Sequence, residues 1–235
     1  MSSKGFKAAR KKDVTDFLNI IGRLGINYHL LDHKDGLNDK LWGYRIENLV
    51  IPVDNSTLKH IRPLGFSNVE IITEIDMESK IDQWMNLNDP FTSLSFRSML
   101  KGTNAKTERI HYLSFHVDRH NGAPTNEIHP LYHLQYLQNG KAKPKDEFDH
   151  GESMQLDVPR MMHFPMDLIL GVSFLLSNFA PAIYTKLIED RQYINLCKEY
   201  QQRIWRPYVD SLNNFWTTTA ASWQWNPKLN CPYLV

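Results

Sequence analysis

Histidine is the residue type that points most directly to chemistry in this sequence, because most of its copies lie in one part of the chain. Seven of the ten histidines fall between residues 111 and 163, at His111, His116, His120, His129, His133, His150 and His163. An imidazole titrates close to physiological pH, so it can transfer protons, bind a metal ion or hold an anion. A functional site is therefore expected where this stretch folds back on itself.

Two segments of this stretch alternate apolar and polar residues, as half-buried β-strands do. The first ends at Asp118 and carries His116 on the same face as that carboxylate. The second carries His133 and Gln135 on one face. If the two strands pair as a hairpin, all four side chains share one face of a sheet. We predict His116, His133, Asp118 and Gln135 as the candidate catalytic group.

Three interpretations of this group remain open from the sequence. Two imidazoles that flank a phosphodiester can act as general acid and general base. Two neutral imidazoles and a carboxylate can hold zinc or manganese, but the four-residue spacing of His129 and His133 suits a helix and these residues are expected in a strand, so no metal site is predicted. The third interpretation is a set of partly buried sheet histidines, hydrogen-bonded to their neighbours. The sequence indicates no particular cofactor.

A second acidic pattern, Pro52-Val53-Asp54 followed by Glu78-Ser79-Lys80, is similar to the Pro-Asp … Glu-x-Lys arrangement of a family of metal-dependent nucleases. Carboxylates on adjacent strands beside a lysine can bind magnesium and orient a water molecule. Here Asp54 is expected at the end of a strand and Glu78 at the start of a helix. This placement favours a solvated charged surface over a metal site.

The segment before the most apolar helix offers a candidate anion site. Arg160 and His163 precede the expected helix N-terminus, where free N–H groups and the helix dipole favour negative charge. With His129 they form the candidate ligand-binding residues. The alternative is structural: Arg160 pairs with Asp157 or Asp167, and the prolines shape the connection.

Both ends of the chain suggest contacts with a partner. Trp223, Trp225 and Tyr233 are predicted as partner-binding residues, because an aromatic C-terminal tail can form an exposed patch. The alternative is a tail that folds back and closes its own core. Residues 1–12 are predicted as a flexible basic tail that could contact phosphates of a nucleic acid.

Composition limits the class of protein. Of 235 residues 42% are hydrophobic, and 27 Lys and Arg nearly balance 26 Asp and Glu, so no overall field attracts a polyanion or a lipid surface. The longest apolar run is too short to cross a bilayer, which requires roughly 20 residues. The two cysteines lack disulfide or zinc spacing and indicate a reducing compartment. A cytoplasmic protein without membrane contact is expected.

The order of elements predicts an α+β fold. Helices are expected at 13–24, 77–86, 165–179, 182–205 and 208–216, and strands at 26–31, 41–53, 67–75, 109–118 and 130–138. An antiparallel sheet of about five to six strands, covered by the N-terminal and C-terminal helices, accounts for this order. We predict one domain over 13–235, strand-rich at 26–158 and helical at 165–216, with an aromatic tail at 217–235. Residues 138–152 are expected as an exposed loop.

Two segments, His129-Pro130-Leu131-Tyr132-His133-Leu134-Gln135 and Pro159-Arg160 through His163-Phe164-Pro165-Met166-Asp167-Leu168, resemble patterns in bacterial protein families of unknown function. Some of these families are encoded beside mobile-element or antiviral genes. The resemblance covers less than a quarter of the chain and implies a bacterial accessory protein without implying any catalytic residue.

The leading hypothesis is therefore an accessory or effector subunit that binds a macromolecular partner, a protein, a second copy of the chain or a nucleic acid, in a bacterial defence or mobile-element system. One alternative is a phosphodiester-cleaving enzyme that uses the histidines. Another is a sensor of a small anionic ligand.

Overall fold

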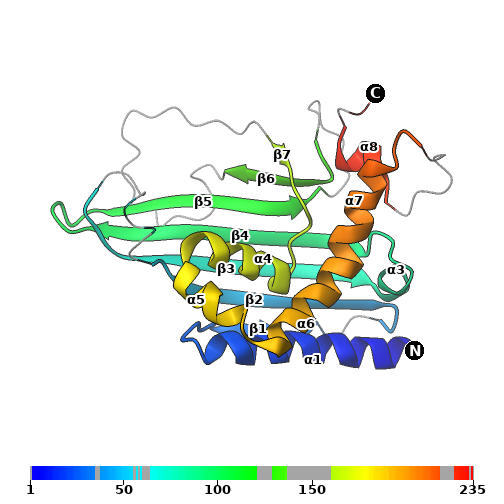
Figure 1. Ribbon diagram of the computed structural model, residues 1–235, viewed down its shortest axis with the longest axis horizontal. Helices are drawn as coiled ribbons and strands as arrows, with labels where there is room; N and C mark the ends of the chain where they lie inside the picture. The colour runs from blue at the N-terminus through cyan, green and yellow to red at the C-terminus, as the bar shows by residue number, and fades with distance from the viewer. Residues whose placement is uncertain are drawn as a thin grey trace.

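The computed structural model of the chain describes residues 2–34, 38–54, 57, 59, 64–120, 129–136, 160–217, 225–232 and 234. Seven strands form one antiparallel sheet, and helices lie across one of its faces (Figure 1). The strands are β1 (Leu30–Asp32), β2 (Leu41–Pro52), β3 (Phe66–Lys80), β4 (Phe91–Asn104), β5 (Ile110–Arg119), β6 (Tyr132–Tyr136) and β7 (Met161–Met162). Each strand pairs with the next one along the chain. The predicted α+β class is confirmed, with one strand more than the upper end of the expected five to six.

Strand β4 was not predicted, and a buried hydroxyl explains why. Its inward-facing positions include Phe96 and Leu100, but Ser98 stands between them. Ser98 lies in the sheet interior, where its Oγ is 3.1 Å from Oγ1 of Thr73 on β3. This polar pair interrupts the apolar alternation that marks a strand in the sequence. Strand β3 also continues past Ile75, so the helix expected at 77–86 shrinks to α3 (Ile81–Met85).

The first helix is longer than predicted. Helix α1 (Ser3–Gly22) begins ten residues before the expected start at Asp13, and Ser2 caps it by accepting a hydrogen bond from the Gly5 N–H. In place of the expected flexible tail, Ser3 to Lys12 form its first turns. Phe6 and Arg10 are buried along one face of these turns, so this segment is part of the packed structure.

The C-terminal helices also differ in detail from the prediction. They are α4 (Leu168–Phe179), α5 (Pro181–Leu187), α6 (Arg191–Tyr200), the π-helical turn η1 (Gln201–Trp205), α7 (Arg206–Asn213) and α8 (Pro227–Asn230). The helix expected at 182–205 is interrupted where Asp190 caps the start of α6. Pro207 was expected to end a helix, but it lies in α7, directly after the π-helical turn η1.

The helical layer packs directly onto the sheet through α4. The Cβ that an alanine would add at Gly171 would lie 2.2 Å from Cε2 of Phe96 on β4, so only glycine permits this approach. At the N-terminus of α4, the Leu168 N–H donates to the hydroxyl of Tyr44 on β2. Residues that alternate with Phe96 and Tyr44 therefore point to the opposite face, which we call the open face of the sheet.

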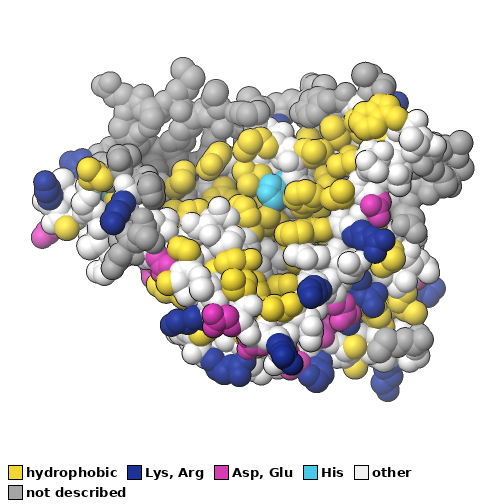
Figure 2. Space-filling model, in the orientation of Figure 1, with side chains coloured by type: hydrophobic (Ala, Val, Ile, Leu, Met, Phe, Trp, Pro, Cys, Tyr) yellow, Lys and Arg dark blue, Asp and Glu magenta, His cyan; other side chains and the backbone are white. Residues whose placement is uncertain are grey.

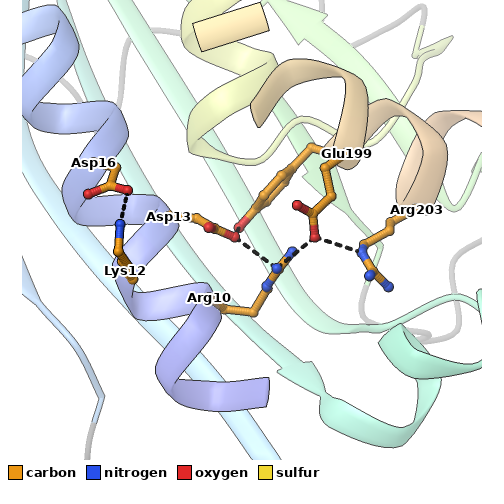
Figure 3. Close-up of polar contacts among 7 residues, drawn as sticks. Arg10, Lys12, Asp13, Asp16, Glu199 and Arg203 are labelled. Atoms are coloured by element: carbon orange, nitrogen blue, oxygen red, sulfur yellow. Dashed lines mark hydrogen bonds and ion pairs between the residues drawn. The ribbon is translucent and has the colours of Figure 1, made fainter. Parts of the chain in front are cut away.

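A buried arginine joins α1 to α6. The guanidinium of Arg10 lies 3.1 Å from Asp13 and 2.6 Å from Glu199 (Figure 3). It also stacks over the rings of Phe6 and Tyr200. Burial opposes the charge of Arg10, but its acidic neighbours outweigh burial and raise its pKa.

No helix among the described residues is long and apolar enough to cross a membrane.

Candidate functional site: a histidine cluster on the open face of the sheet

Strands β5 and β6 bring the four predicted catalytic residues together. In their antiparallel register, His116 lies directly opposite Gln135, and Asp118 lies directly opposite His133. Directly opposed residues of a sheet point to the same face. The four side chains therefore lie next to one another on the open face.

The imidazoles are in direct contact. The rings of His116 and His133 meet edge to face, with centroids 5.6 Å apart. His129 adds a third ring, whose Nε2 lies 3.2 Å from Nε2 of His133. His120 stacks on His129 with centroids 4.1 Å apart. We refer to these four residues, His116, His120, His129 and His133, as the histidine cluster.

Burial controls the protonation of the cluster. His133 is only 4% exposed, and His116 is 8% exposed. Desolvation, followed by the nearby positive charge of His129 and His116, lowers the pKa of His133 to about 3. His133 is therefore neutral at physiological pH and can donate through one ring nitrogen while the other accepts.

A carboxylate completes the cluster on the side of His116. Oδ2 of Asp118 lies 3.7 Å from Nε2 of His116, longer than a hydrogen bond but close enough for an ion pair when the imidazole is protonated. Asp118 and His116 stand two residues apart on β5, which places both side chains on one face because successive strand residues alternate.

A buried polar tie fixes the end of the hairpin that carries the cluster. The Tyr132 hydroxyl donates to Oδ1 of Asp89 at 2.5 Å, and Nη2 of Arg119 donates to Oδ2 at 3.2 Å. Burial raises the pKa of Asp89, and these two donors oppose that rise. Because Tyr132 and Arg119 are register partners, the tie holds β5 and β6 in the alignment that the cluster requires.

Next to the cluster the open face is hollowed. A cavity of about 410 Å³, which we call the sheet hollow, is lined among others by Arg45, Asp76, Ser95, Arg97, Asp118 and Arg119. Arg97 on β4 lies directly opposite His116, and Ser95 lies directly opposite Asp118. The hollow and the cluster therefore meet at Asp118, and a ligand in the hollow would lie beside the His116 and Asp118 pair.

Neither metal arrangement considered from the sequence is assembled in the described residues. No group of three or more His, Cys, Asp or Glu side chains among them is arranged to hold a metal ion. Asp54 instead accepts a hydrogen bond from the Ala182 N–H at the start of α5. Glu78 pairs with Lys34 near the other end of β3, so the two carboxylates of the nuclease-like pattern do not meet.

Two of the three predicted ligand-binding residues lie near His133, and the third lies elsewhere. His129 joins the cluster, and Arg160 lies close enough to His133 for its charge to lower the pKa of that imidazole. His163 packs against Phe164 and Phe174 instead. The N-terminus of α4 is already satisfied, because the Leu170 N–H donates to Asp167 and the Leu168 N–H to Tyr44. Asp157, the other proposed partner of Arg160, lies outside the described residues.

The aromatic tail contributes to the core where it is described. Trp225 is 1% exposed, packs against Tyr132 and Tyr208, and donates from Nε1 to the Leu87 carbonyl. This placement corresponds to the alternative of a tail that folds back. Trp223 and Tyr233 lie outside the described residues, as does the expected loop at 138–152.

Some members of the site were not assigned from the sequence. Arg97 lies on the strand that sequence alternation did not reveal, so its position opposite His116 had no signal. His120 was counted in the histidine-rich stretch, but both His120 and His129 lie outside the regular strands, so no strand period predicts their contact. Asp89 precedes β4 and reaches Tyr132 only through the fold.

The chain matches no protein-family model, no curated protein and no solved structure. Its function is therefore argued from the geometry and chemistry of the site itself.

Proposed function

We propose that the protein is an enzyme that cleaves phosphodiester bonds with the histidine cluster. The observation that carries the proposal is that His116, Asp118, His133 and Gln135 stand side by side on the open face, at the edge of the sheet hollow. Acid–base cleavage of such a bond needs positioned imidazoles and no covalent cofactor. This set of side chains contains two imidazoles that could serve in that way.

The environments of the two central histidines favour different roles. General acid–base catalysis is most effective when the pKa of the group lies near the working pH. His133, with a pKa of about 3, is a weak base and suits a hydrogen-bonding role toward the ligand. His116 lies 3.7 Å from the carboxylate of Asp118, which stabilises the imidazole when it takes up a proton. We therefore assign proton transfer to His116 and positioning to His133.

Arginines around the cluster support an anionic substrate. Arg97 lines the sheet hollow, and Arg160 lies within electrostatic reach of His133. Guanidinium groups bind phosphate oxygens through paired, charge-assisted hydrogen bonds. Glu74 and Asp76 also line the hollow, so the site has mixed charge and suits a short ligand with one or two phosphates better than a long polyanion.

The test is hydrolysis by the purified full chain. Bis(p-nitrophenyl) phosphate and short single-stranded RNA and DNA oligonucleotides are incubated with wild type, His116→Ala and Asp118→Asn, with and without EDTA. We expect EDTA-resistant release of product by wild type. His116→Ala should lower kcat by about 100-fold or more, the usual contribution of a general acid or base. Asp118→Asn should reduce kcat and move the pH–rate profile.

His111→Ala is the matched control, because His111 lies on β5 but packs against Phe66, on the face opposite the cluster. Its rate should equal that of wild type. The proposal fails if wild type hydrolyses none of the three substrates, or if His116→Ala retains full activity while remaining folded by circular dichroism.

A second candidate function, an accessory subunit that binds a protein partner, is favoured by exposed apolar side chains beside β6. Leu113, Tyr136, Met161 and Phe164 are 51%, 54%, 45% and 41% exposed. Hydrophobic side chains gather along the middle of the helix-bearing side in Figure 2. Contiguous apolar surface of this kind marks interaction sites. The bacterial, cytoplasmic defence or mobile-element role predicted from the sequence belongs to this candidate, and two free cysteines fit a reducing compartment.

Self-association provides a direct test of this second candidate. Sedimentation velocity of wild type and of Tyr136→Glu with Met161→Glu would show whether the surface joins two copies. A concentration-dependent dimer that the double variant abolishes supports it. A monomer at all concentrations rules out the second copy as the partner.

A further inference from the structure

A second cavity lies away from the histidine cluster, between the turn after α3 and the helical segment α6–η1–α7. This groove, which we call the Leu87 groove, has a volume of about 690 Å³ and is lined among others by Met85, Leu87, Gln202, Arg203, Arg206 and Asp210. It shares no lining residue with the sheet hollow. The backbone of its walls has two unusual features.

The first is the backbone of Leu87. After α3, the Asn88 N–H donates to the Gln83 carbonyl and the Leu87 N–H contacts the Trp84 carbonyl, which is the hydrogen-bond pattern of a helix end closed by a left-handed residue. Leu87 adopts φ 58°, at a position that glycine usually occupies because other residues are strained there. A leucine is thus kept where glycine would fold more easily.

The Leu87 side chain contributes little to the core in return for this strain. It is 37% exposed, and neighbouring Met85 is 40% exposed, so both present apolar surface to the groove. The tie between this turn and the C-terminal segment runs through the backbone, because Trp225 donates to the Leu87 carbonyl. The Leu87 side chain therefore takes no part in the hydrogen bond from Trp225, and it lies instead on the wall of the groove.

The second unusual feature is the opposite wall, where α6 runs into the π-helical turn η1. Such turns are rare and occur frequently at functional sites. This turn carries Gln202 and Arg203, and Arg206 follows at once. The two unusual backbone features, from parts of the chain more than a hundred residues apart, thus face each other across one cavity.

The groove is lined by two basic and two acidic side chains, Arg203, Arg206, Glu199 and Asp210, so anion binding would depend on the guanidinium N–H groups that the Arg–acid pairs leave over. Arg203 contacts Glu199 through Nε, and Glu199 is also bound by Arg10, which leaves the Nη end of Arg203 without a hydrogen bond within the described residues (Figure 3). Arg206 donates from Nη1 to Gln202, and its side chain is 69% exposed, with Nε 3.7 Å from Asp210. Guanidinium groups with free N–H donors bind carboxylates strongly.

We propose that the Leu87 groove is a binding site for a small amphipathic carboxylate, with its apolar chain against Met85 and Leu87 and its carboxylate on Arg203 and Arg206. The wall chemistry matches such a molecule at both ends. The proposal is independent of catalysis at the histidine cluster.

Isothermal titration calorimetry of the full chain with octanoate tests the proposal, and octyltrimethylammonium serves as a probe with the same chain and the opposite charge. We expect octanoate to bind one molecule per chain with a Kd near or below about 1 mM, and the cationic probe not to bind. Arg206→Gln should weaken octanoate binding about tenfold, and Arg206→Lys should restore part of it.

Leu87→Gly separates a binding role from a structural one. Glycine relieves the left-handed strain, so the Tm should stay the same or rise by a few degrees, whereas octanoate binding should weaken at least tenfold. Glu108→Gly is the matched control, because Glu108 also has φ 58° and lies in the turn between β4 and β5. It should change the Tm in the same direction and leave binding unchanged. Leu87→Ala should weaken binding while keeping the strained backbone.

Three results would overturn the proposal. Octanoate could fail to bind wild type, the cationic probe could bind equally well, or Leu87→Gly could lower the Tm and leave octanoate binding unchanged. The last result would assign Leu87 to the core.

Discussion

Nε2 of His129 and Nε2 of His133 lie 3.2 Å apart, so one of these nitrogens donates and the other accepts. Two protonated nitrogens would repel at this distance, which limits the pair to one shared hydrogen. This contact and the burial of His133 act together to keep that imidazole neutral. His133 is thus a neutral hydrogen-bonding group beside His116.

We predict that His133 does not ionise between pH 5 and pH 8. Its pKa is lowered to about 3 by desolvation and by neighbouring imidazoles, so its ring nitrogens should keep the chemical shifts of one neutral tautomer throughout this range. Two-dimensional ¹⁵N–¹H NMR of histidine-labelled protein measures this directly, with His133→Gln used to assign the signals. A His133 signal that titrates near pH 6.5 would contradict the prediction.

The same pKa predicts how stability changes with acid. Between about pH 3 and pH 6.5 an unfolded His133 binds a proton and the folded one does not, so lowering the pH through this range favours the unfolded chain. Relative to His133→Gln, wild type should lose about 1 to 2 kcal/mol of unfolding free energy between pH 6.5 and pH 5. Urea titrations at several pH values measure the difference. Parallel pH profiles for the two proteins would show that His133 is solvated.

The face shared by the catalytic candidates could be predicted because a strand has a period of two residues. His116 with Asp118 and His133 with Gln135 keep their face whatever the exact strand ends are, provided that the register does not slip by one. Their chemical roles could not be predicted in the same way. The low pKa of His133 depends on burial and on His129, which reaches it from outside a regular element.

The parts of the fold that were missed share a physical cause, because each depends on a tertiary contact. Strand β4 hides its alternation behind Ser98, which is satisfied only by Thr73 of another strand. The first turns of α1 read as a solvated basic tail until Arg10 meets Glu199 of α6. A local pattern cannot reveal a polar residue that is buried by a distant partner.

Arg10 predicts a large loss of stability on truncation. Arg10→Ala would remove a buried guanidinium from between Asp13 and Glu199 and leave both carboxylates without it, which should lower the unfolding free energy by about 3 kcal/mol or more. Lys12→Ala is the matched control on the same helix, because the Lys12 side chain is 72% exposed and pairs with Asp16 at the surface (Figure 3). Its cost should stay below about 1 kcal/mol. Equal costs, measured by urea unfolding, would contradict this account.

Asp167 should make the protein less stable as the pH rises toward neutral. This pH dependence is opposite in sign to that caused by His133. Burial, opposed by backbone N–H donors, raises its pKa to about 7, so between about pH 4 and pH 7 the folded carboxyl keeps a proton that the unfolded one has lost. Relative to Asp167→Asn, which can still cap α4, wild type should lose about 2 to 4 kcal/mol of unfolding free energy as the pH rises through this range. A difference that is constant with pH would show that Asp167 is ionised throughout.

Replacing Gly171 with alanine, a better helix former, should destabilise the protein. In an isolated helix, replacing glycine with alanine gains up to about 1 kcal/mol. In α4 the new methyl group would lie 2.2 Å from Cε2 of Phe96, a fully buried ring with little freedom to move, so Gly171→Ala should lower the unfolding free energy by about 1 to 3 kcal/mol. Gly22→Ala in α1 is the matched control, because nothing lies within 4 Å of the added atom, and it should be neutral or stabilising. Phe96→Leu should recover part of the loss in the Gly171→Ala background by giving the methyl group room. Thermal unfolding of the three variants measures these changes in stability. A Gly171→Ala protein as stable as Gly22→Ala would mean that α4 does not pack on the sheet through this glycine.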